Sequence, residues 1–311
     1  MLAIFESILP VFLIVLLGVV LKRLPIVDRN VWHGLEEVGY YVLFPAILFL
    51  TLYRADFGGL ELAEVALGTL CAVAFMFLLM LALWPALKRG NISGAVYSTL
   101  FQTATRWNGF VALAIANKLY GDTGLALTAL VMAIVIIPIN FGNVTMLIWF
   151  VNPHRDIKTL ATRLFTNPLI LSALAGILCR YFDVSLYEPL EEAIDLVASA
   201  ALGMGMLMVG AGLRIRDTVR PRPIALLPVF LKLFLFPAVL VGFSWYFGAR
   251  GEILVILATI GAVPTAMNGY LLARQMGGDA PLYATIATLQ TAAAFFTIPL
   301  VISAAAYVTS G

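Results

Sequence analysis

The chain has 311 residues and a formal net charge of +2, with 62% hydrophobic and 12% charged residues. Its mean hydropathy is +1.01. These values exclude a soluble globular protein and indicate an integral membrane protein. The lipid bilayer is therefore the first expected partner, and no nucleic-acid partner is expected.

Apolar runs of about 20 residues, the length that crosses roughly 30 Å of hydrocarbon, recur along the whole chain. Ten spans are predicted, at residues 4–21, 38–53, 65–87, 94–119, 125–150, 168–182, 196–213, 224–247, 253–276 and 282–308. The first run lacks a basic leader and a small-residue cleavage site, so we interpret it as a membrane helix and not as a signal peptide.

The positions of Lys and Arg between the spans predict the orientation. With the N-terminus outside, thirteen of these residues face the cytoplasm, and four face outward: Arg54, Lys118, Arg180 and Arg250. Positive residues are normally in excess on the cytoplasmic side. We therefore expect a multi-pass protein of the cell membrane with both termini outside.

Two patterns occur twice at nearly the same separation. The stretch "RWNGFVALAIANKLYGD" is echoed by "AMNGYLLARQMGGD", and "VIIPINF" by "FTIPLVI". When the two copies are aligned, Asn108 corresponds to Asn268 and Pro138 corresponds to Pro299. Each half, 1–152 and 153–311, holds five predicted spans. Because five is odd, the second half must enter the membrane from the opposite side, which predicts inverted repeats.

Inverted repeats with interrupted helices are typical of secondary transporters, whose substrate lies near the membrane midplane. Asn108 and Gly109 mark a predicted break in the fourth span, and Pro264 marks one in the ninth. Freed N–H groups near Phe110 and Tyr270 favour an anion, while freed carbonyls favour a cation.

Two basic residues fall within predicted spans. Arg106 lies about 12 residues into its span, or ~18 Å at the helical rise. Its guanidinium could bind a substrate carboxylate in bidentate fashion or pair with a carbonyl at the break. Lys232 is a coupling candidate: it could replace a coupling cation, relay a proton, or bond to freed carbonyls.

Neutral polar residues also occur in the spans. Most of them, including Gln290, are expected to form hydrogen bonds between helices. We leave a further role open for the polar residues close to the breaks, such as Gln102 and Thr265.

These motifs resemble the auxin efflux carrier family, in its prokaryotic branch of malonate- and malate-transporter-like proteins, which is related in fold to the bile-acid sodium symporters. The resemblance rests on "YYVLFPAILFLTL", the asparagine-centred break, "TNPLILSALAGIL", and "AVPTAMNGYLLARQMGGD" followed by "TIPL". It covers roughly residues 1–305.

The resemblance implies ten helices, with helices 4 and 9 broken where they cross. It implies a scaffold of helices 1, 2, 6 and 7, a transport bundle of helices 3–5 and 8–10, elevator-like movement and a homodimer. Asn108 and Asn268 are implied substrate contacts, and Pro264 shapes the second crossing. The candidate site is completed by the residues beside them: Arg106, Gly109, Phe110, Thr265, Gly269 and Tyr270.

A stripe of small residues in the seventh span is a candidate packing surface that could face the second copy. It consists of Ala198, Ala201, Gly205 and Gly212.

The predicted function is secondary transport of a small organic anion, a carboxylate such as malonate or malate. An uncoupled anion channel or uniporter, or a membrane-embedded ligand sensor, is the alternative. No GxSxG, HExxH or Walker A motif occurs in the sequence, so we expect no enzyme and no nucleotide-driven pump. Cys71 and Cys179 lie in apolar spans, and no metal or other cofactor is expected. Any coupling ion would be H⁺ or Na⁺.

Overall fold

The computed structural model describes residues 2–24, 28–55, 62–151, 166–218 and 221–309. In these ranges the chain is helical, without a strand. The longer helices are α1 (Leu2–Arg23), α3 (Phe44–Arg54), α4 (Leu62–Arg89), α5 (Gly94–Thr105), α6 (Gly109–Val151), α8 (Pro168–Tyr181), α9 (Glu188–Gly212), α11 (Phe236–Phe247) and α14 (Ala280–Thr309). The shorter ones are α2 (Arg29–Val38), α10 (Leu226–Phe230), α12 (Glu252–Gly261) and α13 (Asn268–Met276).

The chain is an integral multi-pass membrane protein by the length and apolarity of these helices. Seven helical stretches among the described residues are long and apolar enough to cross a membrane. One of them, Gly94–Val151, covers two of the ten predicted spans. The short apolar helices Pro168–Tyr181 and Glu252–Gly261 fall on two more. Length and composition thus identify seven stretches that could cross a membrane, and the count of ten crossings stays a prediction.

Two membrane helices contain a π-helical turn directly before a Phe-Pro-Ala sequence. The turns are η1 (Gly39–Leu43) and η4 (Leu231–Leu235). Pro45 and Pro237 follow them at the starts of α3 and α11. Proline lacks an N–H and its ring displaces the preceding turn, so the helix widens there. Lys232 lies in the second of these turns.

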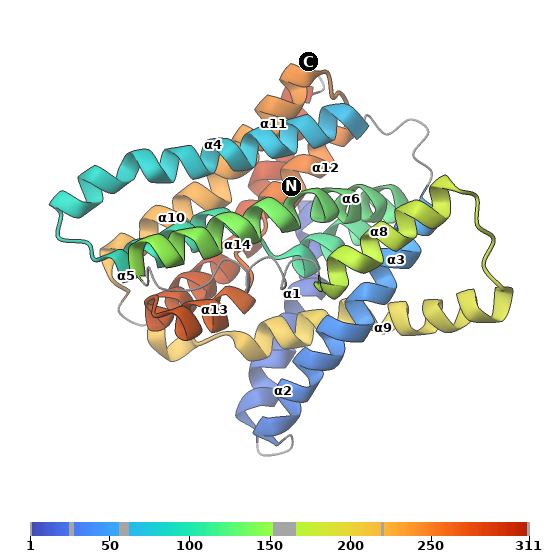
Figure 1. Cartoon of the computed structure of the whole chain (residues 1–311), viewed down its shortest axis with the longest axis horizontal. Coiled ribbons are helices and arrows are strands. Elements are labelled where there is room, and N and C mark those ends of the chain that lie inside the picture. The colour runs from blue at the N-terminus through green and yellow to red at the C-terminus, as the bar shows by residue number, and fades with distance from the viewer. Residues whose placement is uncertain (1, 25–27, 56–61, 152–165, 219–220, 310–311) are drawn as a thin grey trace.

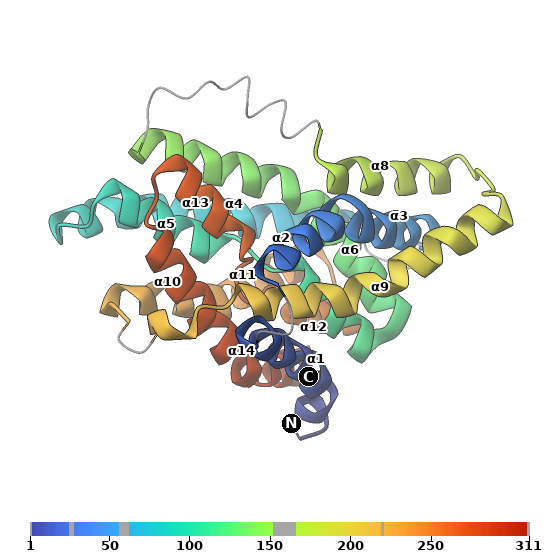
Figure 2. The ribbon, with the colours of Figure 1, turned by 90° about the horizontal axis from the view of Figure 1, so that it is seen from below.

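The helices gather in two groups. Figure 2 shows α3, α8 and α9 on one side of the molecule and α5, α10 and α13 on the other. Helix α9 packs against both α1 and α3, and α3 packs against α8. In the other group α4 lies along α11 (Figure 1). Buried apolar side chains of α4, α5, α6, α11 and α12 form one large core.

The small residues of α9 pack inside this chain. A Cβ atom on Gly210 would overlap the carbonyl group of Val15, and one on Gly18 would overlap the carbonyl group of Leu207. The α1 and α9 backbones are therefore in direct contact. In the predicted stripe, Ala198 is 6% and Ala201 0% exposed. Within the stripe, Ala201 and Gly205 pack against neighbouring helices of the same chain, as expected of a packing surface, and a contact with a second copy stays a prediction.

Candidate functional site

The first interruption lies between α5 and α6. Helix α5 ends at Thr105, and Arg106 is extended, with φ −71° and ψ 153°. The new helix begins at Gly109. The side-chain oxygen of Asn108 accepts hydrogen bonds from the N–H groups of Phe110 (3.2 Å) and Val111 (3.3 Å). Asn108 therefore caps the second half-helix and satisfies the donors that the interruption frees.

The second interruption, at residues 262–267, touches the first. It lies between the end of α12 at Gly261 and the start of α13 at Asn268. The carbonyl of Pro264 accepts a hydrogen bond of 2.8 Å from the N–H of Asn108. The structure thus brings together two positions that lie in different halves of the sequence.

Gln290 of α14 joins both interruptions to the helix that contains Lys232. Its side-chain oxygen accepts from the N–H of Thr265 at 2.8 Å. Its Nε2 donates to the carbonyls of Thr103 at 3.0 Å and of Pro228 at 2.9 Å. The side chain is fully buried. This is the interhelical hydrogen bonding that was expected of Gln290, and it holds three separate segments in register.

A glycine follows each asparagine at a point where another helix passes closely. A Cβ on Gly109 would lie 2.8 Å from Sδ of Met132, and one on Gly269 would overlap the hydroxyl of Tyr283. That hydroxyl donates to the carbonyl of Ala266 at 2.6 Å and lies 3.2 Å from Oγ1 of Thr265. Larger residues at these two glycines would push the part of α6 after its bend at Gly121, and α14, away from the interruptions.

Arg106 lies at the first interruption and has no acidic partner in the described part of the chain. Its side chain is 6% exposed. In the described part of the chain its Nε is buried without a hydrogen-bond partner. Its backbone N–H donates to the carbonyl of Gln102 at 2.8 Å. The ion pairs found among the described residues do not include Arg106. An arginine is always charged and only donates, so this position is suited to an anion.

The side chain of Lys232 extends from the eighth predicted span to the end of α12, the first half of the ninth. It is fully buried, and its Nζ donates to the carbonyl of Gly261 at 2.6 Å. The ammonium also lies 4.5 Å from the centre of the Phe236 ring. Three roles were left open for Lys232: replacing a coupling cation, relaying a proton, or bonding to freed carbonyls. This geometry matches the third, because the Gly261 carbonyl lies at the C-terminal end of α12, where a cation is favoured.

The other candidate residues lie at the edges of the site. Asn268 is exposed, and α13 begins without a side-chain cap, so Asn268 does not repeat the capping role of Asn108. Tyr270 accepts a hydrogen bond of 2.6 Å from Nη2 of Arg214, whose guanidinium lies 4.5 Å from the ring centre. Phe110 stacks on Phe44 with ring centres 3.4 Å apart.

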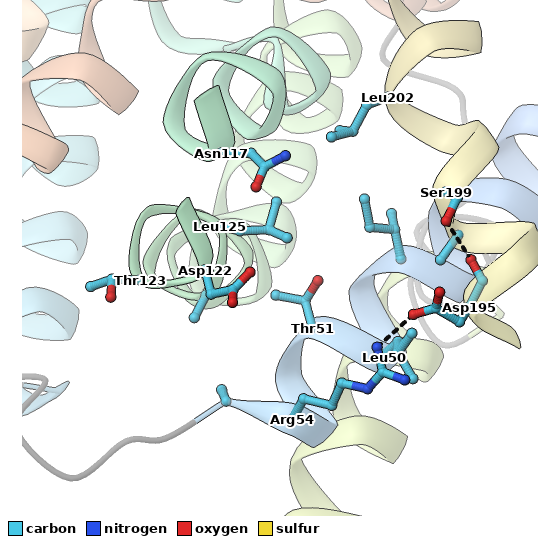
Figure 3. Close-up of a pocket in the computed structure, with 14 residues that line it drawn as sticks. Leu50, Thr51, Arg54, Asn117, Asp122, Thr123, Leu125, Asp195, Ser199 and Leu202 are labelled. Carbon is cyan, nitrogen blue, oxygen red and sulfur yellow. Dashed lines mark hydrogen bonds and ion pairs between the residues drawn. The ribbon is translucent and has the colours of Figure 1, made fainter. Parts of the chain in front are cut away.

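A cavity of about 790 Å³ opens between α3, α9 and the bend of α6 at Gly121 (Figure 3). Arg54 at its edge pairs with Glu191 at 2.7 Å and with Asp195 at 2.5 Å, which ties α3 to α9. Figure 3 shows Asp122 and Thr51 pointing into the same space from opposite sides. Its polar lining residues are Thr51, Arg54, Asn117, Asp122, Thr123, Asp195 and Ser199.

The aromatic stack lies beyond the cavity, toward the interruptions. Along α3, α6 and α9 the lining residues nearest to the interruptions are Ile47, Asn117 and Leu202. Phe44, Phe110 and Gly205 follow one or two turns further along the same helices. A Cβ on Gly205 would lie 3.0 Å from the Phe44 ring. The stacked rings of Phe44 and Phe110, packed against Gly205, therefore lie between the cavity and the interruptions.

Sequence reasoning found the interruptions and Arg106 but missed this cavity. The sequence predicted that Arg54 faces outward but not which residues it pairs with. The available signal was the acidic run "LEEAID", whose carboxylates needed a partner. Some of the thirteen basic residues expected on the cytoplasmic side lie outside the described residues, among them Arg155, Lys158 and Arg163. The same is true of His154.

Comparison with known proteins indicates membrane transport. The pattern of a family described as "Membrane transport protein" matches residues 153–302. The chain is 24% identical over 301 residues to an "Uncharacterized transporter" of Methanothermobacter thermautotrophicus, covering 95% of this chain and 96% of that protein. It is 26% identical over 280 residues to a "Putative malonate transporter" of Rhizobium meliloti, covering 87% and 86% respectively.

The helices, the paired interruptions and these relatives define a membrane transport protein and not an enzyme. The family match and these relatives agree with the resemblance of the motifs to the auxin efflux carrier family.

Proposed function

We propose that this protein is a secondary active transporter of a small organic anion, a carboxylate such as malonate or malate, and that it binds this anion where the interruptions meet. The buried guanidinium of Arg106, which has no acidic partner and an unsatisfied Nε among the described residues, carries the proposal. A carboxylate would supply the partner that Arg106 lacks. The relative whose printed name includes malonate supports the substrate class.

The proposed architecture has ten crossings in two inverted repeats, 1–152 and 153–311. The scaffold would comprise α1, α2 with α3, α8 and α9, and the remaining helices would form the transport bundle. The contacts of α9 with α1 and α3, and of α3 with α8, support such a scaffold. We propose a homodimer in the cell membrane with both termini outside, as the distribution of Lys and Arg predicts.

An elevator-like movement of the bundle would expose the site to each side in turn. The cavity between α3, α9 and α6 lies beside Arg54, on the predicted outer side. Toward the predicted cytoplasmic side, Arg214 holds Tyr270. Phe110 would slide past Phe44 and Gly205 during the movement. This geometry supports a state in which the cavity is open to the outside while the aromatic stack of Phe44 and Phe110 closes the site.

Within the proposed site, Arg106 would hold a carboxylate. The N–H groups of Phe110 and Gly109 would lie at its side, at the positive end of α6. Thr265 and Gly269 would shape the opposite wall, which Pro264 positions. Asn268 and Tyr270, exposed and half-buried here, would reach the substrate when the bundle moves.

We further propose that Lys232 is a fixed cation that replaces a coupling sodium ion. Its ammonium already occupies the carbonyl end of α12, where a bound Na⁺ would otherwise be coordinated. Transport would then depend on a proton gradient or on the gradient of the substrate.

Replacing Lys232 with Met should lower both uptake and thermal stability, because the Gly261 carbonyl loses its partner. The expected loss of unfolding free energy is about 1–3 kcal/mol. Wild-type uptake should not change when choline replaces Na⁺. Lys22→Met, at the predicted cytoplasmic end of the first span, is the matched control and should leave uptake intact. Wild-type uptake driven by an imposed Na⁺ gradient would contradict the proposal.

Flux measurements on purified protein in proteoliposomes test the functional class. A carrier should show saturable uptake of labelled malonate or malate, driven by the gradient to which it is coupled. Flux that rises without saturation would indicate a channel, and binding without flux would indicate a sensor. Failure of folded protein to transport or bind either acid would overturn the carboxylate assignment.

A further inference from the structure

Gln102 is a polar residue of α5 whose side chain has no described partner. It is fully buried, and in the described part of the chain both its Nε2 and its Oε1 are buried without a hydrogen bond. The hydroxyls of its neighbours are satisfied: Thr103 donates to the carbonyl of Thr99, and Thr105 to that of Phe101, each at 2.8 Å. Gln102 is therefore an exception within its own helix.

Burying an amide without partners is unfavourable. Each buried polar group left unsatisfied destabilises the folded state, and native proteins retain few of them. A leucine would fill a similar volume without this cost. Gln290, the other buried glutamine near the interruptions, uses both amide atoms. The contrast indicates that the Gln102 amide is held for a partner from outside the chain.

Gln102 is close to Arg106. The backbone N–H of Arg106 donates to the carbonyl of Gln102 at 2.8 Å, across the last turn of α5. Both side chains are buried, and both have polar atoms without partners among the described residues. The end of α5 therefore offers a guanidinium and a primary amide within one helical turn.

The two groups differ in what they recognise. A guanidinium only donates hydrogen bonds, whereas a primary amide donates through Nε2 and accepts through Oε1. A fully ionised dicarboxylate only accepts hydrogen bonds. It would therefore satisfy the guanidinium of Arg106 and the Nε2 of Gln102, but it would leave the Oε1 of Gln102 without a donor. A ligand that satisfies all of these groups carries a carboxylate and, a short distance away, an O–H group.

We infer that Gln102 is a specificity-determining residue that selects short carboxylates bearing an O–H group. The inference rests on the proposed function and narrows its substrate class. The O–H can belong to the alcohol of a hydroxy acid or to the second carboxyl of a singly protonated dicarboxylate. Sites that hydrogen-bond a substrate hydroxyl reject analogues that lack it, because the protein groups are then left unpaired.

The test compares malate with succinate, which differ by one hydroxyl, in proteoliposomes at pH 7. The wild type should take up malate with a kcat/KM about tenfold or more above that for succinate. Gln102→Leu should reduce this ratio to about one. Thr128→Val is the control, since its hydroxyl bonds only within its own helix, and it should keep the wild-type ratio. Succinate uptake at pH 5 and pH 7 separates the two sources of the O–H: a rise at low pH, lost in Gln102→Leu, assigns the protonated carboxyl.

A binding measurement accompanies the flux assay. Malate should raise the melting temperature of the wild type more than succinate does, and Gln102→Leu should remove that difference while melting above the wild type without ligand. Uptake of both acids with no preference in the wild type, or an unchanged preference in Gln102→Leu, would overturn the inference and leave the transporter assignment standing. No uptake or binding of any acid by folded protein would overturn the proposed function itself, and the inference with it.

Discussion

Arg106→Met is expected to reduce carboxylate uptake strongly while raising thermal stability. The guanidinium would supply charge-assisted hydrogen bonds worth about 1.5–3 kcal/mol, so kcat/KM should fall by about 10- to 150-fold. The same substitution removes a buried charge that has no described partner, which should favour the folded state. Uptake of labelled malate and a thermal melt of the same preparation measure the two effects.

Arg106→Lys is the matched control. Lysine keeps the charge but loses the planar arrangement of donors that binds a carboxylate through two bonds. Its uptake should fall between that of the wild type and that of Arg106→Met. If Arg106→Met transports normally and melts at a lower temperature, the guanidinium is a structural group that pairs with a carbonyl, and the proposed site is wrong.

Gln290→Leu is expected to cause the largest loss of stability among the substitutions near the interruptions. It would leave the Thr265 N–H and the carbonyls of Thr103 and Pro228 without their partner. Buried groups left unsatisfied cost about 1–3 kcal/mol each, so the unfolding free energy should fall by about 3 kcal/mol or more. Denaturation in detergent, followed by helix content, measures it.

Gln102→Leu makes the same chemical change at a second buried glutamine and should shift stability in the opposite direction. The difference follows from the hydrogen bonds that Gln290 makes and that Gln102 does not. Gln290→Glu should lie between the wild type and Gln290→Leu, because it keeps an acceptor for Thr265 and loses both donors. Equal destabilisation by the two leucine variants would contradict the distinction drawn between these glutamines.

The helices and the interruptions were predictable because their signals are local. A proline without an N–H, an Asn-Gly pair and an apolar run each act within a few residues of their own position. Pro264 and Asn108 are found where such signals place them. The π-helical turns before Pro45 and Pro237 have an equally local cause, and the Phe-Pro-Ala sequence was the available signal.

The contacts between distant segments could not be predicted in the same way. Nothing near Gln290 in the sequence shows that its amide meets Thr103, and nothing near Arg54 identifies Glu191 and Asp195 as its partners. The internal repeat also suggested equal roles for Asn108 and Asn268. In the structure, however, Asn108 is buried and caps the start of α6, whereas Asn268 is exposed. A sequence repeat predicts a similar backbone course in both halves. The environment of each side chain depends on the helices that pack against that copy.

The most direct test of the central claim is uptake of labelled malonate and malate by wild type and Arg106→Met, reconstituted side by side at equal amounts of folded protein. We predict saturable uptake of at least one acid by the wild type and a strong reduction of that uptake in Arg106→Met, with the variant at least as stable. Equal uptake by both proteins would contradict a carboxylate site at the meeting point of the two interruptions.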